Sequence, residues 1–187
     1  MAQKFNNDSS VCRFMGDRDL DEVIASDERE LAGIGGSFEA IADRMDYLIA
    51  KSEGIFRNRD KKRADIFRRY GYDTTEIFDV PGRDEDISTP RGKISNEIHL
   101  LYNRPELIPG EKNLALVDII STRMGFQLCP FNCGKGSSSR DYIIRNRKVN
   151  RELWINQLTS HLARAHHLLE KGNEYGISAR EFYESFM

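Results

Sequence analysis

Two cysteines and two histidines in the C-terminal third of the chain have the side chains and the spacing of a metal site. Three residues separate Cys129 from Cys133, and four residues separate His161 from His166. Thiolate sulfur and neutral imidazole nitrogen are the ligands that a four-coordinate structural Zn²⁺ prefers. We therefore predict that these four residues bind one structural Zn²⁺, with His167 as the alternative to His166 as fourth ligand.

The residues around these ligands resemble a zinc finger of the two-Cys, two-His family. The run Cys129-Pro130-Phe131-Asn132-Cys133-Gly134-Lys135 is similar to the Cys knuckle of that family, and Leu158 precedes His161 by three residues, as it does there. The resemblance covers about a third of the chain. It implies a zinc-bound module, and the histidine spacing of the family favours His166 over His167.

Two features depart from the family. Between Cys133 and His161 lie 27 residues, whereas a conventional finger has about a dozen. The chain also has a single finger-like motif, so the reading of three bases by each finger is not carried over to it. The extra length comes mainly from a basic insertion at residues 134–151, whose apolar centre is expected to form a strand or a helical turn.

A site with four protein ligands leaves no open position for water or substrate, and such sites are usually structural. The sequence also contains no glycine-rich phosphate loop, no nucleophile elbow and no paired carboxylates at a spacing typical of catalysis. We therefore expect that this protein is not an enzyme. The zinc ion would instead hold the basic insertion in a fixed shape.

The composition places the chain among globular proteins. A length of 187 residues with 39% hydrophobic side chains is enough for one domain, or for one domain and a small module. Three cysteines do not suggest a disulfide framework, and a Cys-His metal site fits a reduced compartment, so we expect an intracellular protein of the cytoplasm or nucleus. No apolar run approaches the ~20 residues that span a bilayer, which argues against a membrane protein.

The charges are distributed in blocks, although the formal net charge is only −2. Residues 54–69 carry seven Lys or Arg and two Asp, and residues 134–151 carry six Lys or Arg and one Asp. Local basic segments of this kind can guide an encounter with a polyanion even when the net charge is near zero. The predicted phosphate contacts are Arg57, Arg59, Lys61, Lys62, Arg63, Arg68, Arg69, Arg140, Arg145, Arg147, Lys148 and Arg151.

Apolar residues at steps of three and four predict that helices position these groups. One helix is expected after the N-cap Ser37, another over residues 114–124, and a long one from the N-cap Asn150 through both histidines. The capping box that begins at Ser178 predicts a terminal helix. Residues 17–30 are strongly acidic and form either a solvated segment or a short amphipathic helix.

These patterns predict a mainly α fold: a small helical domain followed by a C-terminal zinc-stapled helical module. The expected division is a flexible acidic N-terminal segment at 1–36, a helical domain at 37–128 and a zinc-binding module at 129–187, with a long helix and a C-terminal helix.

The leading functional hypothesis is a zinc-binding protein, regulatory or packaging, that contacts the phosphate backbone of RNA or DNA. The alternative is a zinc-stabilised structural or protein-interaction subunit of a larger assembly, with protein partners or self-association. The near-neutral net charge favours the alternative, and the two basic segments favour nucleic acid.

Overall fold

The computed structural model describes residues 19–73, 86–121, 127–131, 133–135, 137–169 and 176–187. Its helices are α2 (Leu20–Ile34), α3 (Phe38–Arg69), α4 (Pro90–Asn103), α5 (Gln157–His166) and α6 (Ala179–Phe186). Its strands are β1 (Glu106–Leu107), β2 (Leu114–Ser121), β3 (Gln127–Leu128), β4 (Ser137–Ser138), β5 (Arg140–Asn146) and β6 (Arg151–Ile155).

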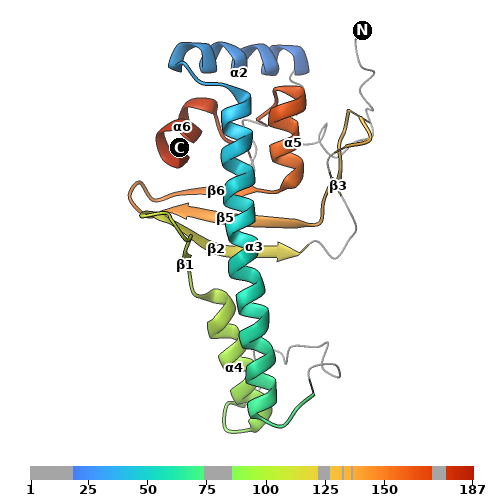
Figure 1. Ribbon diagram of the computed structural model, residues 1–187, viewed down its shortest axis with the longest axis vertical. Helices are drawn as coiled ribbons and strands as arrows, with labels where there is room; N and C mark the ends of the chain where they lie inside the picture. Colours follow the sequence, from blue (N-terminus) through green and yellow to red (C-terminus); the bar gives the residue numbers. More distant parts are fainter. Residues whose placement is uncertain (1–18, 74–85, 122–126, 132, 136, 170–175) are drawn as a thin grey trace.

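The prediction of a mainly α fold is wrong, because an antiparallel sheet of order β1-β2-β5-β6 lies at the centre of the molecule (Figure 1). The predicted helix at 114–124 is strand β2 over its described part. Leu114 and Leu116 are buried two residues apart, which is the period of a strand. β2 pairs with β1 on one side and β5 on the other, so its backbone hydrogen bonds are satisfied within the sheet.

The long helix predicted from Asn150 is also wrong. Asn150 has a φ of 51° in the turn that joins β5 to β6, and the helix starts only after the second strand. Leu153 and Ile155 alternate into the core as strand residues do. Asn156 is the actual N-cap of α5, where it forms a capping box with Thr159.

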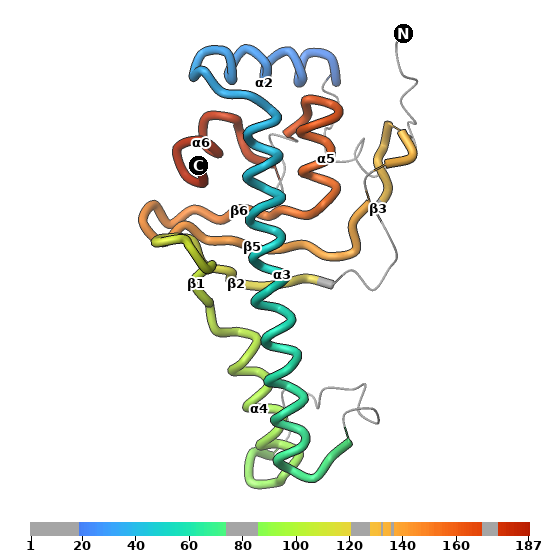
Figure 2. Tube along the Cα trace, in the orientation of Figure 1, coloured from blue at the N-terminus to red at the C-terminus, as the bar shows by residue number. Residues whose placement is uncertain are grey.

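Helix α3 organises the packing. The predicted N-cap Ser37 accepts a hydrogen bond from the backbone N–H of Ala40, which stabilises the first turn. With 32 residues, the helix is about 48 Å long, and its first half crosses one face of the sheet (Figures 1 and 2). There Ile41, Leu48, Leu116 and Ile144 belong to one hydrophobic core and are fully buried.

The second half of α3 extends beyond the sheet and packs against α4 (Figure 1). Ile66 and Phe67 of α3 meet Ile94 and Ile98 of α4 in a smaller hydrophobic cluster. Helix α4 begins with Pro90 after the N-cap Thr89, whose hydroxyl accepts a hydrogen bond from the Gly92 N–H. This pair of helices forms the narrow end of the molecule.

Both ends of the described chain pack against the start of α3. The predicted capping box at Ser178 is present, and it begins α6, whose Phe182 and Phe186 are buried in the main core. Within the acidic segment, α2 forms with Asp19 as its N-cap, so the helical alternative for this segment is confirmed for residues 20–34. The main core contains residues from both sides of Leu128. The domain boundaries at residues 36 and 128 imply that the parts fold independently, and they stay predictions.

No helix among the described residues is both long enough and apolar enough to cross a membrane.

Candidate metal centre

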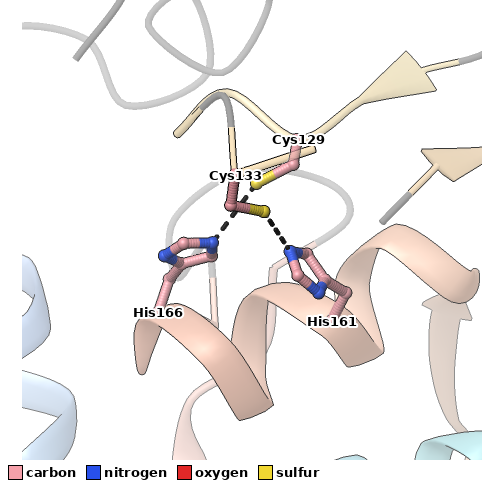
Figure 3. A group of neighbouring side chains, drawn as sticks. All are labelled: Cys129, Cys133, His161 and His166. Atoms are coloured by element: carbon pink, nitrogen blue, oxygen red, sulfur yellow. Dashed lines mark hydrogen bonds between the residues drawn. The ribbon is translucent and has the colours of Figure 1, made fainter. Parts of the chain in front are cut away.

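The four predicted ligands come from two elements that lie next to each other. Cys129 and Cys133 are in the loop between the short paired strands β3 and β4. His161 and His166 project from α5 toward this loop (Figure 3). Gly134, directly after the second cysteine, has a φ of 68°, a left-handed conformation that glycine adopts without steric cost. The cluster is compatible with a zinc-finger-like module, although strands β5 and β6 lie between β4 and α5.

The distances between the ligand atoms fit a tetrahedral ion. The Sγ of Cys129 is 3.3 Å from Nε2 of His166, and the Sγ of Cys133 is 3.1 Å from Nε2 of His161. All four ligand atoms lie within 4.8 Å of one another. Zn–S bonds of about 2.3 Å and Zn–N bonds of about 2.0 Å at tetrahedral angles separate ligand atoms by about 3.3–3.8 Å. The cluster can therefore hold a metal ion with only small shifts, and its donor set is that of zinc.

His166 is in the cluster and His167 is not. The ring of Phe131 stacks on the His166 ring at 3.9 Å between centroids, which fixes its orientation beside the Cys loop. His167 has a φ of 52° at the end of α5, so its side chain leaves in another direction. Its ring stacks on Phe38, and its Nδ1 lies 2.9 Å from a carboxylate oxygen of Glu28.

The protein environment favours the neutral, metal-binding form of His161 and His166 but disfavours the thiolate form of Cys129. Burial lowers the pKa of His161, and the charges of Lys135 and Arg164 lower it further. Burial also lowers the pKa of His166. Both rings therefore stay neutral, which is the form that binds metal. Burial raises the pKa of the Cys129 thiol, so a metal ion must displace its proton.

We expect zinc affinity to decrease as the pH falls below neutrality. Each thiol must release its proton to bind zinc, so the apparent association constant should fall by about tenfold to hundredfold for each pH unit. The lowered pKa values of His161 and His166 mean that histidine protonation adds to this loss only in more acidic solution. Competition with a chromophoric chelator at several pH values measures the slope; an affinity independent of pH would contradict thiolate ligation.

Helix α2 covers the inner side of the metal centre. Val23 of α2, Cys129, and Leu158 and Leu162 of α5 share a buried hydrophobic cluster, with Phe131 packed at its edge. These are the contacts by which the acidic N-terminal segment joins the finger. For this segment the sequence left open either a solvated stretch or a short amphipathic helix, and no local pattern indicated where it would pack.

The side chains at the start of α5 are engaged within the protein. Asn156 is buried and donates a hydrogen bond to Asp141, Thr159 completes the capping box, and Leu162 is in the core. On the same helix, Ser160 donates to the backbone of α3 at Ala42.

The predicted phosphate contacts of the first basic segment lie along α3 and are in different environments. Arg57, Lys61, Lys62, Arg68 and Arg69 are exposed. Arg63 is half-buried, and its guanidinium lies 5.7 Å from the centre of the Phe67 ring.

Arg59 is buried, with only 1% of its surface exposed. Its guanidinium donates to the backbone carbonyls of Tyr102 and Arg104, at 3.2 and 2.8 Å, and lies 3.7 Å from Glu106. These carbonyls are at the C-terminal end of α4, where the helix leaves its last acceptors unpaired. Arg59 therefore holds α4 to α3 and is not part of an exposed basic surface. A charge pattern alone could not separate it from its neighbours.

The second basic segment forms the β5–β6 hairpin, and three of its cations pair with acids. Arg140 lies 3.0 Å from Glu53 and stacks over the Phe56 ring. Arg145 and Arg151 pair with Glu152 and Glu181, at 2.9 and 3.2 Å. Arg147 and Lys148 are exposed in the turn of the hairpin.

Glu53 was not predicted as a functional residue, but it links α3 to the sheet. It accepts hydrogen bonds from Arg140 and from the hydroxyl of the buried Tyr142. No local pattern in the sequence indicates this role, because these partners are 87 and 89 residues away.

Comparison with protein family models, with curated proteins and with solved structures gives no match for this chain.

Proposed function

We propose that this is a zinc-stabilised, nucleic-acid-associated protein that contacts the phosphate backbone through the second half of α3. The observation that carries this proposal is the arrangement of exposed cations on that helix. Arg57, Lys61 and Arg68 fall within about 40° of one another around the helix axis, and Lys62 and Arg69 extend the arc to about 140°. We call these five residues the α3 cationic arc.

The arc has the extent and the charge that a phosphate backbone requires. From Arg57 to Arg68 it covers about 17 Å of helix, and Asp65 is the one acidic residue within it. It lies on the part of α3 that extends beyond the sheet (Figure 1). Arg57 makes only a long 3.9 Å contact with Glu53, so its charge is weakly compensated. Arg68 and Arg69 pair with Asp65 and Glu97, at 2.7 and 2.6 Å, so Arg57, Lys61 and Lys62 are the cations of the arc that carry the proposal.

The β5–β6 hairpin contributes less to this proposal than its sequence suggested. Ion pairs with Glu53, Glu152 and Glu181 already compensate Arg140, Arg145 and Arg151. A phosphate would have to compete with those carboxylates, and fewer counterions would be released on binding. Arg147 and Lys148 in the exposed turn remain as supporting contacts.

In this proposal the zinc ion has a structural role, and the finger helix does not read bases. Leu158, Ser160 and Leu162 of α5 are buried, so the helix offers few side chains to a base. Contacts from Lys and Arg to phosphates position a protein without reading its sequence. We therefore expect binding that depends strongly on salt and weakly on nucleotide sequence.

The test is a variant with Arg57→Gln and Lys61→Gln, compared with the wild type for binding to duplex DNA and RNA of random sequence. Loss of two phosphate contacts should weaken binding at low salt and reduce the slope of log affinity against log salt by about 2. Fluorescence anisotropy over a salt series measures both quantities on protein with confirmed zinc content.

A matched control carries Arg145→Gln and Arg151→Gln, which removes two cations that already have acidic partners. We expect this control to bind nearly as well as the wild type. The proposal is wrong if the wild type does not bind either nucleic acid at low salt, or if the control loses as much affinity as the α3 variant.

A further inference from the structure

A groove of about 1060 Å³ lies between the second half of α3, the end of α4 and strand β1. The β5–β6 turn closes it on one side through Arg147. Figure 1 shows β1 and this turn at the same edge of the sheet, beside the point where α4 ends. None of its lining residues is a metal ligand or belongs to the hydrophobic cluster beside the metal centre.

The floor of the groove exposes aliphatic side chains. Leu100 is 61% exposed and Leu107 is 46% exposed, and both line the groove together with Leu101 and Pro105. Single exposed leucines are normal on protein surfaces, but several in one concave site are typical of a place where another chain docks.

The charges around this floor are unbalanced in favour of cations. The three acidic residues that line the groove have basic partners: Asp65 with Arg68, Glu97 with Arg69 and Glu106 with Arg59. Three lining cations, Lys62, Arg104 and Arg147, form no ion pair with any other residue that the structure describes. An acidic occupant would complement them.

We infer that this groove is a docking site for an acidic peptide segment of a partner protein, with aliphatic side chains as anchors. Carboxylates of the peptide would meet Lys62, Arg104 and Arg147, and its apolar side chains would cover Leu100 and Leu107. β1 is an edge strand of the sheet, and such strands offer unpaired backbone groups to an extended peptide.

The lining favours a peptide over a nucleic acid. Single-stranded nucleic acids bind in basic grooves where aromatic side chains stack on the bases. Among its described lining residues this groove has no Phe, Tyr or Trp. The exposed leucines instead match aliphatic side chains, which a phosphate backbone does not offer.

The test uses a fluorescein-labelled peptide of about twelve residues that alternates glutamate with leucine. We expect saturable binding to the full-length, zinc-loaded protein. Leu100→Ser should weaken it by about tenfold because an apolar contact is lost, and Arg104→Glu should weaken it at least as much by placing like charges together. Leu128→Ser and Arg29→Glu are matched controls, because both residues are exposed and outside the groove, and neither should change the affinity.

Five results would overturn the inference. Three concern the peptide: no binding at about millimolar protein, equal binding of a lysine-leucine peptide, and unchanged binding by the two groove variants. A loss of self-association in Leu100→Ser would make a second copy the occupant, and equal weakening of oligonucleotide binding by Arg104→Glu would make it a nucleic acid. The variant with Arg57 and Lys61 replaced by Gln should retain peptide binding, so this inference and the proposed function fail independently.

Discussion

Cys133→Ser is expected to release the metal ion and to unfold the β3–β4 loop together with its contacts to α5 and α2. Structural zinc contributes about 10–16 kcal/mol of apparent folding energy in small finger peptides. Here α5 also packs in the main core through Ala163, so part of the helix should persist without metal. We therefore expect a loss of about 5 kcal/mol or more in the free energy of unfolding.

The physical reason for this large effect is that the Cys loop has few other contacts to hold it. Strands β3 and β4 have two residues each, and a hairpin of this length is not stable by itself. The hydrophobic cluster beneath it contains five buried residues, one of which is the ligand Cys129. Thermal unfolding followed by circular dichroism, with and without a chelator, measures the loss.

Cys12→Ser is the matched control, since it removes a thiol outside the predicted ligand set. It should bind zinc with the same stoichiometry as the wild type and unfold at the same temperature. Equal thermal stability of the wild type with and without chelator would contradict the structural role of the metal.

Arg59→Ala has the second largest expected effect, and it should act on stability alone. The substitution leaves the carbonyls of Tyr102 and Arg104 without their donor and opens a cavity between α3 and α4. Loss of hydrogen bonds from a charged donor together with a cavity costs about 3 kcal/mol. The temperature of unfolding should fall by about 6–12 °C in a protein of this size.

Lys61→Ala, two residues further along the same helix, is the comparison for Arg59→Ala. Lys61 is exposed, so its replacement should change the unfolding free energy by less than about 0.5 kcal/mol while weakening nucleic-acid binding. If Arg59→Ala were as stable as Lys61→Ala, the buried position of Arg59 between α3 and α4 would be wrong.

The metal centre could be predicted because its signal is local. Cys129 and Cys133 are close in sequence, His161 and His166 are about one and a half helical turns apart, and the chemistry of these side chains is specific to few functions. The N-cap Ser37 was predictable for the same reason, since a capping residue bonds within its own first turn.

The sheet could not be predicted with the same success, because its stabilising contacts are between distant residues. Leu114 and Val117 are three residues apart, which fits one face of a helix. The pairing of β2 with β5 makes this segment a strand instead. Trp154 and Leu158 also fitted one helical face, but Trp154 lies in β6 and Leu158 in α5. Tertiary pairing of this kind overrides local periodicity.

The long gap between the cysteines and histidines has a structural explanation. In a conventional finger a short hairpin leads directly into the helix, whereas here the β5–β6 hairpin is inserted between β4 and α5. This hairpin joins the central sheet through β2, so the finger is continuous with the main core and α3 covers its helix. The inserted hairpin thus accounts for most of the 27 residues between Cys133 and His161.

X-ray absorption spectroscopy at the zinc edge tests the metal centre most directly. For full-length protein loaded with one equivalent of zinc, we predict a first shell of two sulfur atoms at about 2.3 Å and two nitrogen atoms at about 2.0 Å. The Cys133→Ser variant should lose one sulfur or bind no zinc. A first shell of oxygen and nitrogen alone in the wild-type protein would contradict ligation by Cys129, Cys133, His161 and His166.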